Sequence, residues 1–119
     1  MEPEQPYRYR HSVFFRLSDR TASTRQSFVD LTWQLLATGH PGMLSCTIGL
    51  RDEQMQRTVN DQRFDISLDM IFESRQSYDA YRDHPQHQEW VARAGNMSPE
   101  RLVFDSFLLE PPAKTERGD

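Results

Sequence analysis

The residues best suited to proton transfer in this sequence are two histidines, a tyrosine and an aspartate. Tyr81 and His87 lie six positions apart; an imidazole titrates near neutral pH and can act as a base, and a phenol can donate a hydrogen bond to a carbonyl oxygen. His11 and Asp105 lie on segments expected to form neighbouring antiparallel strands, where the carboxylate can orient the imidazole. These residue types suit removal of a proton beside a carbonyl group, a reaction that requires no metal or cofactor.

The same residues also have a structural interpretation. His84 and Pro85 suit a helix break and cap, with His87 bound to a backbone carbonyl and Tyr81 packed as an amphipathic ring in the core. The strand pair can equally be a hydrogen-bonded histidine and a carboxylate at a dimer contact. A metal site at His84 and His87 is not expected, because Pro85 interrupts the helix that would align the two rings.

Composition favours one small cytoplasmic domain. The chain has 119 residues, a net charge of −4 and a pI near 5.5, so it lacks the basic character of nucleic-acid-binding proteins. The single cysteine, Cys46, cannot form an internal disulfide, and its apolar neighbours predict a buried strand position in a reducing compartment. No apolar run reaches about 18 residues, so we expect no membrane segment, and the polar N-terminus lacks the hydrophobic stretch of a signal peptide.

Alternating and helical hydrophobic periods predict the elements that position these residues. Strands are predicted at 8–17, 43–50, 64–72 and 102–109, and helices at 21–38, from Ser74 to 83, and again from Pro85. Residues 51–63 are polar and predict a loop or hairpin tip, whereas 1–7 and 111–119 are proline-rich and charged and predict flexible tails around a domain at 8–110.

This order is the ferredoxin-like βαββαβ pattern of an α+β domain with a four-stranded antiparallel sheet. Helices can cover only one face of such a sheet, and a core stripe should lie beneath them, comprising Val13, Phe15, Ile66, Leu68 and Met70. The other face is left for water or a partner, and alternation places on it Ser12, Phe14, Arg16, Asp65, Ser67, Asp69 and Ile71.

Short segments spread over residues 10–110 resemble the stress-responsive A/B barrel (Dabb) family, in the family's own order. They are Arg10-His11-Ser12-Val13, Pro41-Gly42-Met43-Leu44-Ser45, Phe64-Asp65 followed by Phe72-Glu73-Ser74, Tyr81-Arg82-Asp83-His84-Pro85-Gln86-His87 and Phe104-Asp105. The resemblance implies a homodimer in which two sheets face each other as a dimeric α/β barrel. Arg16 would then meet Asp69 or Asp65 at the sheet interface.

The family includes a plant polyketide cyclase, and the resemblance therefore implies a candidate site. Tyr81 and His87 match the cyclase's catalytic tyrosine and histidine, His11 matches a histidine of its pocket floor, and Asp105 matches an aspartate of its closing strand. One hypothesis is a homodimer of undetermined activity that binds a small ligand in a pocket between sheet and helices. The alternative is a cofactor-independent cyclase or lyase acting on a small polyketide-like ketone through His87 and Tyr81.

Two tryptophans depart from the cyclase pattern. Trp33 lies where the cyclase has a tyrosine, and Trp90 replaces a smaller aromatic residue, so either indole can fill space that a long alkyl tail would need. The full set of residues expected to line the ligand site is His11, Val13, Phe15, Trp33, Leu68, Met70, Trp90 and Asp105.

Overall fold

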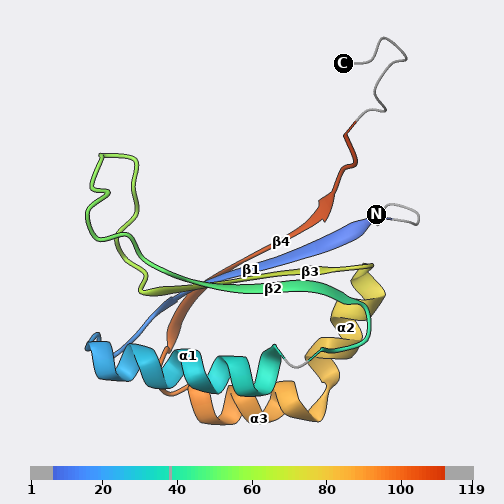
Figure 1. Cartoon of the computed structure of the whole chain (residues 1–119), viewed down its shortest axis with the longest axis horizontal. Helices are drawn as coiled ribbons and strands as arrows, with labels where there is room; N and C mark the ends of the chain where they lie inside the picture. Colours follow the sequence, from blue (N-terminus) through green and yellow to red (C-terminus); the bar gives the residue numbers. More distant parts are fainter. Residues whose placement is uncertain (1–6, 38, 112–119) are drawn as a thin grey trace.

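A four-stranded antiparallel sheet carries three helices on one face in the computed structural model, which describes residues 7–37 and 39–111 (Figure 1). The elements are β1 (Arg8–Arg16), α1 (Ala22–Leu36), β2 (Met43–Leu50), β3 (Ile66–Phe72), α2 (Arg75–Asp83), α3 (Pro85–Ala94) and β4 (Glu100–Leu108). The strand order is β2-β3-β1-β4, so the predicted ferredoxin-like α+β fold is confirmed. The predicted tails fall largely on residues 1–6 and 112–119, outside the described residues.

Alternation along the central strand β1 separates the two faces of the sheet as predicted. His11, Val13 and Phe15 are buried toward the helices, and Ser12 and Phe14 between them face the opposite side. Val13 lies directly opposite Leu68 of β3 and Val103 of β4, so the register carries the same division onto both neighbouring strands. We call the side without helices the open face.

Each helix begins at a side chain that caps it. The Thr21 hydroxyl accepts a hydrogen bond from the Thr24 N–H at 3.2 Å, and the Ser74 hydroxyl accepts one from the Ser77 N–H at 3.1 Å. At the start of α3 the ring Nδ1 of His84 accepts from the Gln86 N–H at 3.0 Å. The cap expected at His84-Pro85 therefore forms. Helix α1 ends at Leu36, two residues before the predicted end at 38, which is itself outside the described residues.

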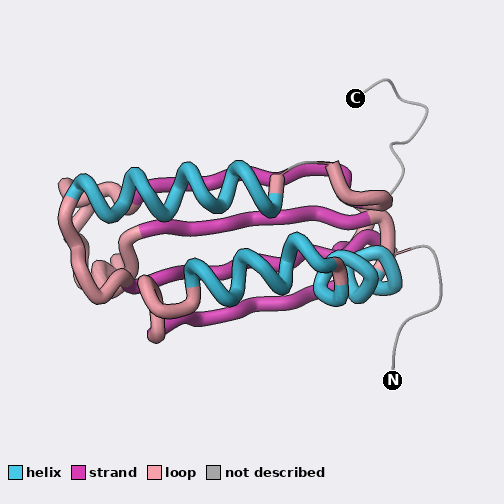
Figure 2. Tube along the Cα trace, turned by 90° about the horizontal axis from the view of Figure 1, so that it is seen from below, coloured by secondary structure: helices cyan, strands magenta, loops and turns pink. Residues whose placement is uncertain are grey.

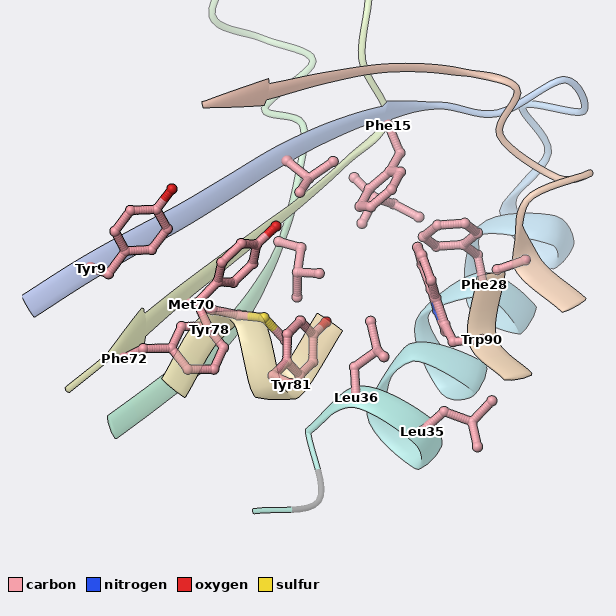
Figure 3. Close-up of a cluster of buried hydrophobic side chains, with 14 of the residues drawn as sticks. Tyr9, Phe15, Phe28, Leu35, Leu36, Met70, Phe72, Tyr78, Tyr81 and Trp90 are labelled. Carbon is pink, nitrogen blue, oxygen red and sulfur yellow. The ribbon is translucent and has the colours of Figure 1, made fainter. Parts of the chain in front are cut away.

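The core lies between the sheet and the helices, which run along the strands when viewed from the helix side (Figure 2). Phe15 of β1, Phe28 of α1 and Trp90 of α3 pack against one another, with ring centroids 4.9–5.8 Å apart (Figure 3). The buried Trp90 N–H donates to the Thr32 hydroxyl at 3.0 Å, and that hydroxyl donates to the Phe28 carbonyl at 2.7 Å. The indole is thus fully satisfied within the core.

Alternation predicts Leu44 on one face with Cys46, and Phe64 on one face with Ile66, and both orientations are wrong. Leu44 is 47% exposed, because an irregularity between Met43 and Ser45 shifts the register of β2 and breaks the alternation. Phe64 does not continue the core stripe of β3 but packs edge-on against Phe14 of the open face, at 5.1 Å between centroids. Strand β3 begins only at Ile66 for this reason.

Asp65 is the third correction, because it is buried instead of lying on the open face. Its side chain is 0% exposed and accepts hydrogen bonds from the Leu17 N–H at 2.9 Å and the Arg20 Nε–H at 2.9 Å. Its own backbone N–H donates to the Phe15 carbonyl at 2.7 Å, and its carbonyl accepts from the Arg51 N–H at 3.1 Å. The side chain and backbone of this one residue therefore join the end of β1, the approach to α1 and both ends of the β2–β3 connection.

Charged residues of the open face pair with cross-strand neighbours within the chain. Within the chain Asp69 binds Arg10 at 2.8 Å and accepts from the Ser12 hydroxyl at 2.6 Å, while Arg16 lies 3.6 Å from Glu100. Arg16 contacts neither Asp69 nor Asp65 among the ion pairs of residues 7–37 and 39–111. The contact of Arg16 with Asp69 or Asp65 was expected between two subunits at the dimer interface, and it stays a prediction.

Replacing Asp65 by Ala should lower the free energy of unfolding by about 2–3 kcal/mol, because it leaves a buried backbone N–H and the Arg20 guanidinium without their acceptor. Urea denaturation of both proteins measures the difference. The matched control is Asp61→Ala, since Asp61 is half-exposed and pairs only with its neighbour Arg63. Equal destabilisation by the two variants would contradict the role given to Asp65.

Candidate functional site

The site begins with a hydrogen-bonded pair between β1 and β4. His11 lies directly opposite Asp105, and its Nδ1 is 2.6 Å from the Asp105 carboxylate. The His11 side chain is 10% exposed and that of Asp105 is 32% exposed, so the pair lies at the border of the core and solvent. A carboxylate can only accept, so in the neutral ring the proton lies on Nδ1 and Nε2 keeps its lone pair. The orientation expected from the sequence is therefore present.

Tyr78 is a site residue that the sequence analysis missed. Its ring packs against His11 at 4.7 Å between centroids and against Tyr9 at 5.2 Å. Burial, together with the nearby Asp105 charge, raises the pKa of Tyr78 to about 12, so the phenol keeps its proton. The available signal was its spacing, because Tyr78 and Tyr81 are three apart and share one face of α2.

Tyr81 and His87 are neighbours, as the motif suggested, but Tyr81 is packed inside the core. Its ring is 2% exposed and lies 5.0 Å from the His87 ring, and it points from α2 toward the sheet (Figure 3). Burial raises the pKa of the Tyr81 phenol far above its ordinary value, with smaller contributions from Cys46 and Tyr78. Tyr81 can therefore donate a hydrogen bond but does not supply a phenolate near neutral pH.

His87 has a ring nitrogen without a partner. Its Nδ1 is buried and makes no hydrogen bond to any described residue. Burial lowers the pKa of the His87 imidazole, followed by the charge of His11, and a backbone hydrogen bond with Arg82 partly opposes the shift. His87 is thus held neutral, the state in which an imidazole can accept a proton or a hydrogen bond.

His40, the first residue of the turn signal His40-Pro41-Gly42, is also part of this cluster. It is 6% exposed, and its ring stands edge-on to Tyr81 at 5.1 Å and to His84 at 4.9 Å. Its Nε2 is buried and has no hydrogen-bond partner in the described part of the chain. Burial lowers the pKa of His40, and the neighbouring His84 adds to the shift. Its position depends on contact with α2, which local sequence could not indicate.

The expected lining residues divide into three groups. His11 and Asp105 form the polar pair, while the apolar wall of the core beside them comprises Val13, Phe15, Leu68 and Met70. Trp90 is 3% exposed and fills core space, as the structural alternative expected. The placement of Trp33 is wrong, since it is 44% exposed on the outer side of α1 and cannot line an interior site.

An approach to the His11–Asp105 pair exists along β4. Val103 shares the helix side of the sheet with Val13, which it faces across the strand pair, yet it is 48% exposed. Helix α2 packs on β1 and β3, so the edge strand β4 remains uncovered beside it. The Asp105 carboxylate is therefore partly exposed at this edge, at 32%.

Comparison with known proteins identifies the family. The family model described as "Stress responsive A/B Barrel Domain" matches residues 9–108. The chain belongs to this family. No curated protein matches the chain.

Solved structures of the same fold include relatives of varied description. A Dabb family protein from Mesorhizobium loti is 22% identical, with a TM-score of 0.71, and the match covers 87% of this chain and 99% of that one. A dimeric ferredoxin-like protein of unknown function from Thermobifida fusca is 21% identical, with a TM-score of 0.69 and coverage of 87% and 93%. A hydroxynitrile lyase from Passiflora edulis is 18% identical, with a TM-score of 0.71 and coverage of 92% and 100%. These matches show the shared fold.

None of the described helices has the length and hydrophobicity needed to cross a membrane.

The lowered pKa values of His40 and His87 predict acid sensitivity. Each unfolded imidazole binds its proton near pH 6.5, whereas the folded ring does so only at lower pH. Stability from these two groups is therefore fully present above that pH and is lost as the pH falls toward the folded-state pKa. Urea midpoints at pH 7.5 and 5 should differ less in the H40Q/H87Q variant than in the wild type. An unchanged difference would contradict this prediction.

Proposed function

We propose that this Dabb protein is a homodimer that binds a small, uncharged carbonyl compound between the sheet and the helices, beside His11 and His87. The unpartnered His87 Nδ1 carries the proposal, because a buried polar atom without a partner is costly unless something binds it. The oriented His11 ring supplies a second polar group, joined to His87 through the packed rings of Tyr78 and Tyr81 at 4.7, 6.1 and 5.0 Å between successive centroids. Each imidazole offers a donor or an acceptor for a carbonyl or hydroxyl group.

The charges around the site favour an uncharged ligand. Tyr78 and Tyr81 remain protonated and His87 remains neutral, so none of them attracts an anion. Asp105 adds a negative charge at the entrance along β4, which disfavours a carboxylate. The surrounding wall is apolar, which suits a ligand with a hydrocarbon body.

The homodimer is supported by the open face and by the relatives. Leu102 and Phe104 of β4 are each 56% exposed on that face, an amount of apolar surface that a monomer would leave in water. Structures of the same fold are described as dimeric, including the one from Thermobifida fusca. Burial of two open faces against each other would remove this surface from water.

Acetylacetone, a small diketone, should bind the wild-type protein, and H87L should weaken binding about ten-fold or more because it removes the unpartnered nitrogen. Isothermal titration calorimetry measures both affinities. Gln88→Ala is the matched control, since Gln88 is the exposed neighbour on the same helix and should leave binding unchanged. Equal affinities for H87L and the control, or no binding by the wild type, would overturn the proposal.

Proton transfer on a ketone is the second candidate function, and the His11–Asp105 pair favours it. A carboxylate that fixes the imidazole tautomer leaves Nε2 ready to accept a proton, the arrangement that general bases use. In D2O the wild type should then speed exchange of the α-protons of 2-heptanone, followed by NMR, and D105N should reduce the rate by about ten-fold or more. Exchange no faster than in buffer would remove this candidate and leave ligand binding in place.

A further inference from the structure

Residues 51–65, which connect β2 to β3, form an arm that projects from the sheet on the side opposite the helices (Figure 1). The arm is held by its own side chains. The Gln62 amide donates to the Met55 carbonyl at 2.7 Å, and its oxygen accepts from Arg51 at 2.7 Å. Near the tip, Arg57 donates to the Asn60 side-chain oxygen at 3.0 Å. The buried Asp65 anchors the base, so the shape of the arm is set before it meets any partner.

The arm carries apolar side chains that contact little in the single chain. Val59 is 82% exposed and Met55 is 44% exposed. A preorganised segment that presents apolar residues loses little conformational entropy when it docks. The arm therefore has the properties of a binding element.

A cleft of about 810 Å³ lies between the arm and the open face. Aromatic rings share its lining with charged side chains, among them Arg16, Arg63 and Glu100. Phe14, Phe64 and Phe104 contribute to the lining and meet edge to face at 5.1 and 5.9 Å between centroids. Filling this space with apolar side chains would release water from an aromatic surface.

We propose that the arm is a dimer clasp, and that the cleft beneath it receives apolar side chains from the open face of a second copy of this chain. The inference rests on the proposed homodimer and adds the segment that secures it. In the dimer Val59 lies against the partner and the space beneath the arm is closed.

Two observations select a second copy as the occupant. The cleft lining includes three arginines, Arg16, Arg63 and Arg101, and two carboxylates, Asp61 and Glu100. Asp61 lies 2.7 Å from Arg63 and Glu100 lies 3.6 Å from Arg16, so one net positive charge remains, too little to select a nucleic acid. The cleft is also continuous with the proposed dimer face, because Phe14 lines both this cleft and a second hollow of about 320 Å³ over the middle of the open face.

The test compares two valine variants of the full-length chain. Val59→Lys alters the arm tip, and Val91→Lys makes the same change at a 40% exposed position on α3, on the helix side. Sedimentation equilibrium should show a dimer for the wild type, an unchanged dissociation constant for V91K, and one raised about ten-fold or more for V59K. Equal dissociation constants for V59K and V91K would overturn the clasp.

Two further measurements distinguish the proposed clasp from the homodimer itself. A wild type that stays monomeric would overturn both the homodimer and the clasp. If F104K weakens dimerisation and V59K does not, the sheet-face dimer is retained and the clasp is rejected. A photoreactive benzoylphenylalanine at position 59 gives an independent reading in mixed ¹⁴N and ¹⁵N dimers. Crosslinks between differently labelled chains support the clasp, and crosslinks confined to one chain contradict it.

Discussion

Coverage of the sheet on one side only is the constraint on which the rest of this molecule depends. Because side chains alternate along β1, His11 is directed toward the helices and Ser12 and Phe14 toward the open face. The helix side collects the buried imidazoles and phenols, and the open face collects exposed aromatic residues. The two proposed activities, ligand binding and dimerisation, therefore use opposite faces of the same strand and do not compete for residues.

Packing controls the chemistry of the helix side. Burial keeps Tyr81 protonated and His87 neutral, and the Asp105 carboxylate on the adjacent strand fixes the orientation of His11. The β1–β4 register makes that last contact possible, so a slip of one residue would place His11 and Asp105 on opposite faces. The site therefore depends on the register of the strands more than on any single sequence motif.

The sequence predicted those features of the fold that local residue patterns determine. Period-two alternation placed β1 correctly, and cap chemistry located the starts of α2 and α3. The expected antiparallel pairing of the first and last strands anticipated the His11–Asp105 contact. Prediction from the sequence failed where tertiary contacts decide. Asp65 fits a surface pattern yet is buried by partners about 45 residues away in sequence. His40 is buried by its contact with Tyr81 of α2, and Trp33 is exposed to solvent. The local sequence around these two residues does not determine whether they are buried.

The most direct test of the account is an NMR titration of the full-length protein with acetylacetone, observing the aromatic ring signals of both faces together. The account predicts that the His11 and His87 ring signals shift with a common saturation curve while those of Phe14 and Phe104 stay fixed. Shifts confined to Phe14 and Phe104 would place the ligand on the open face and contradict the assignment of functions to the two sides of the sheet.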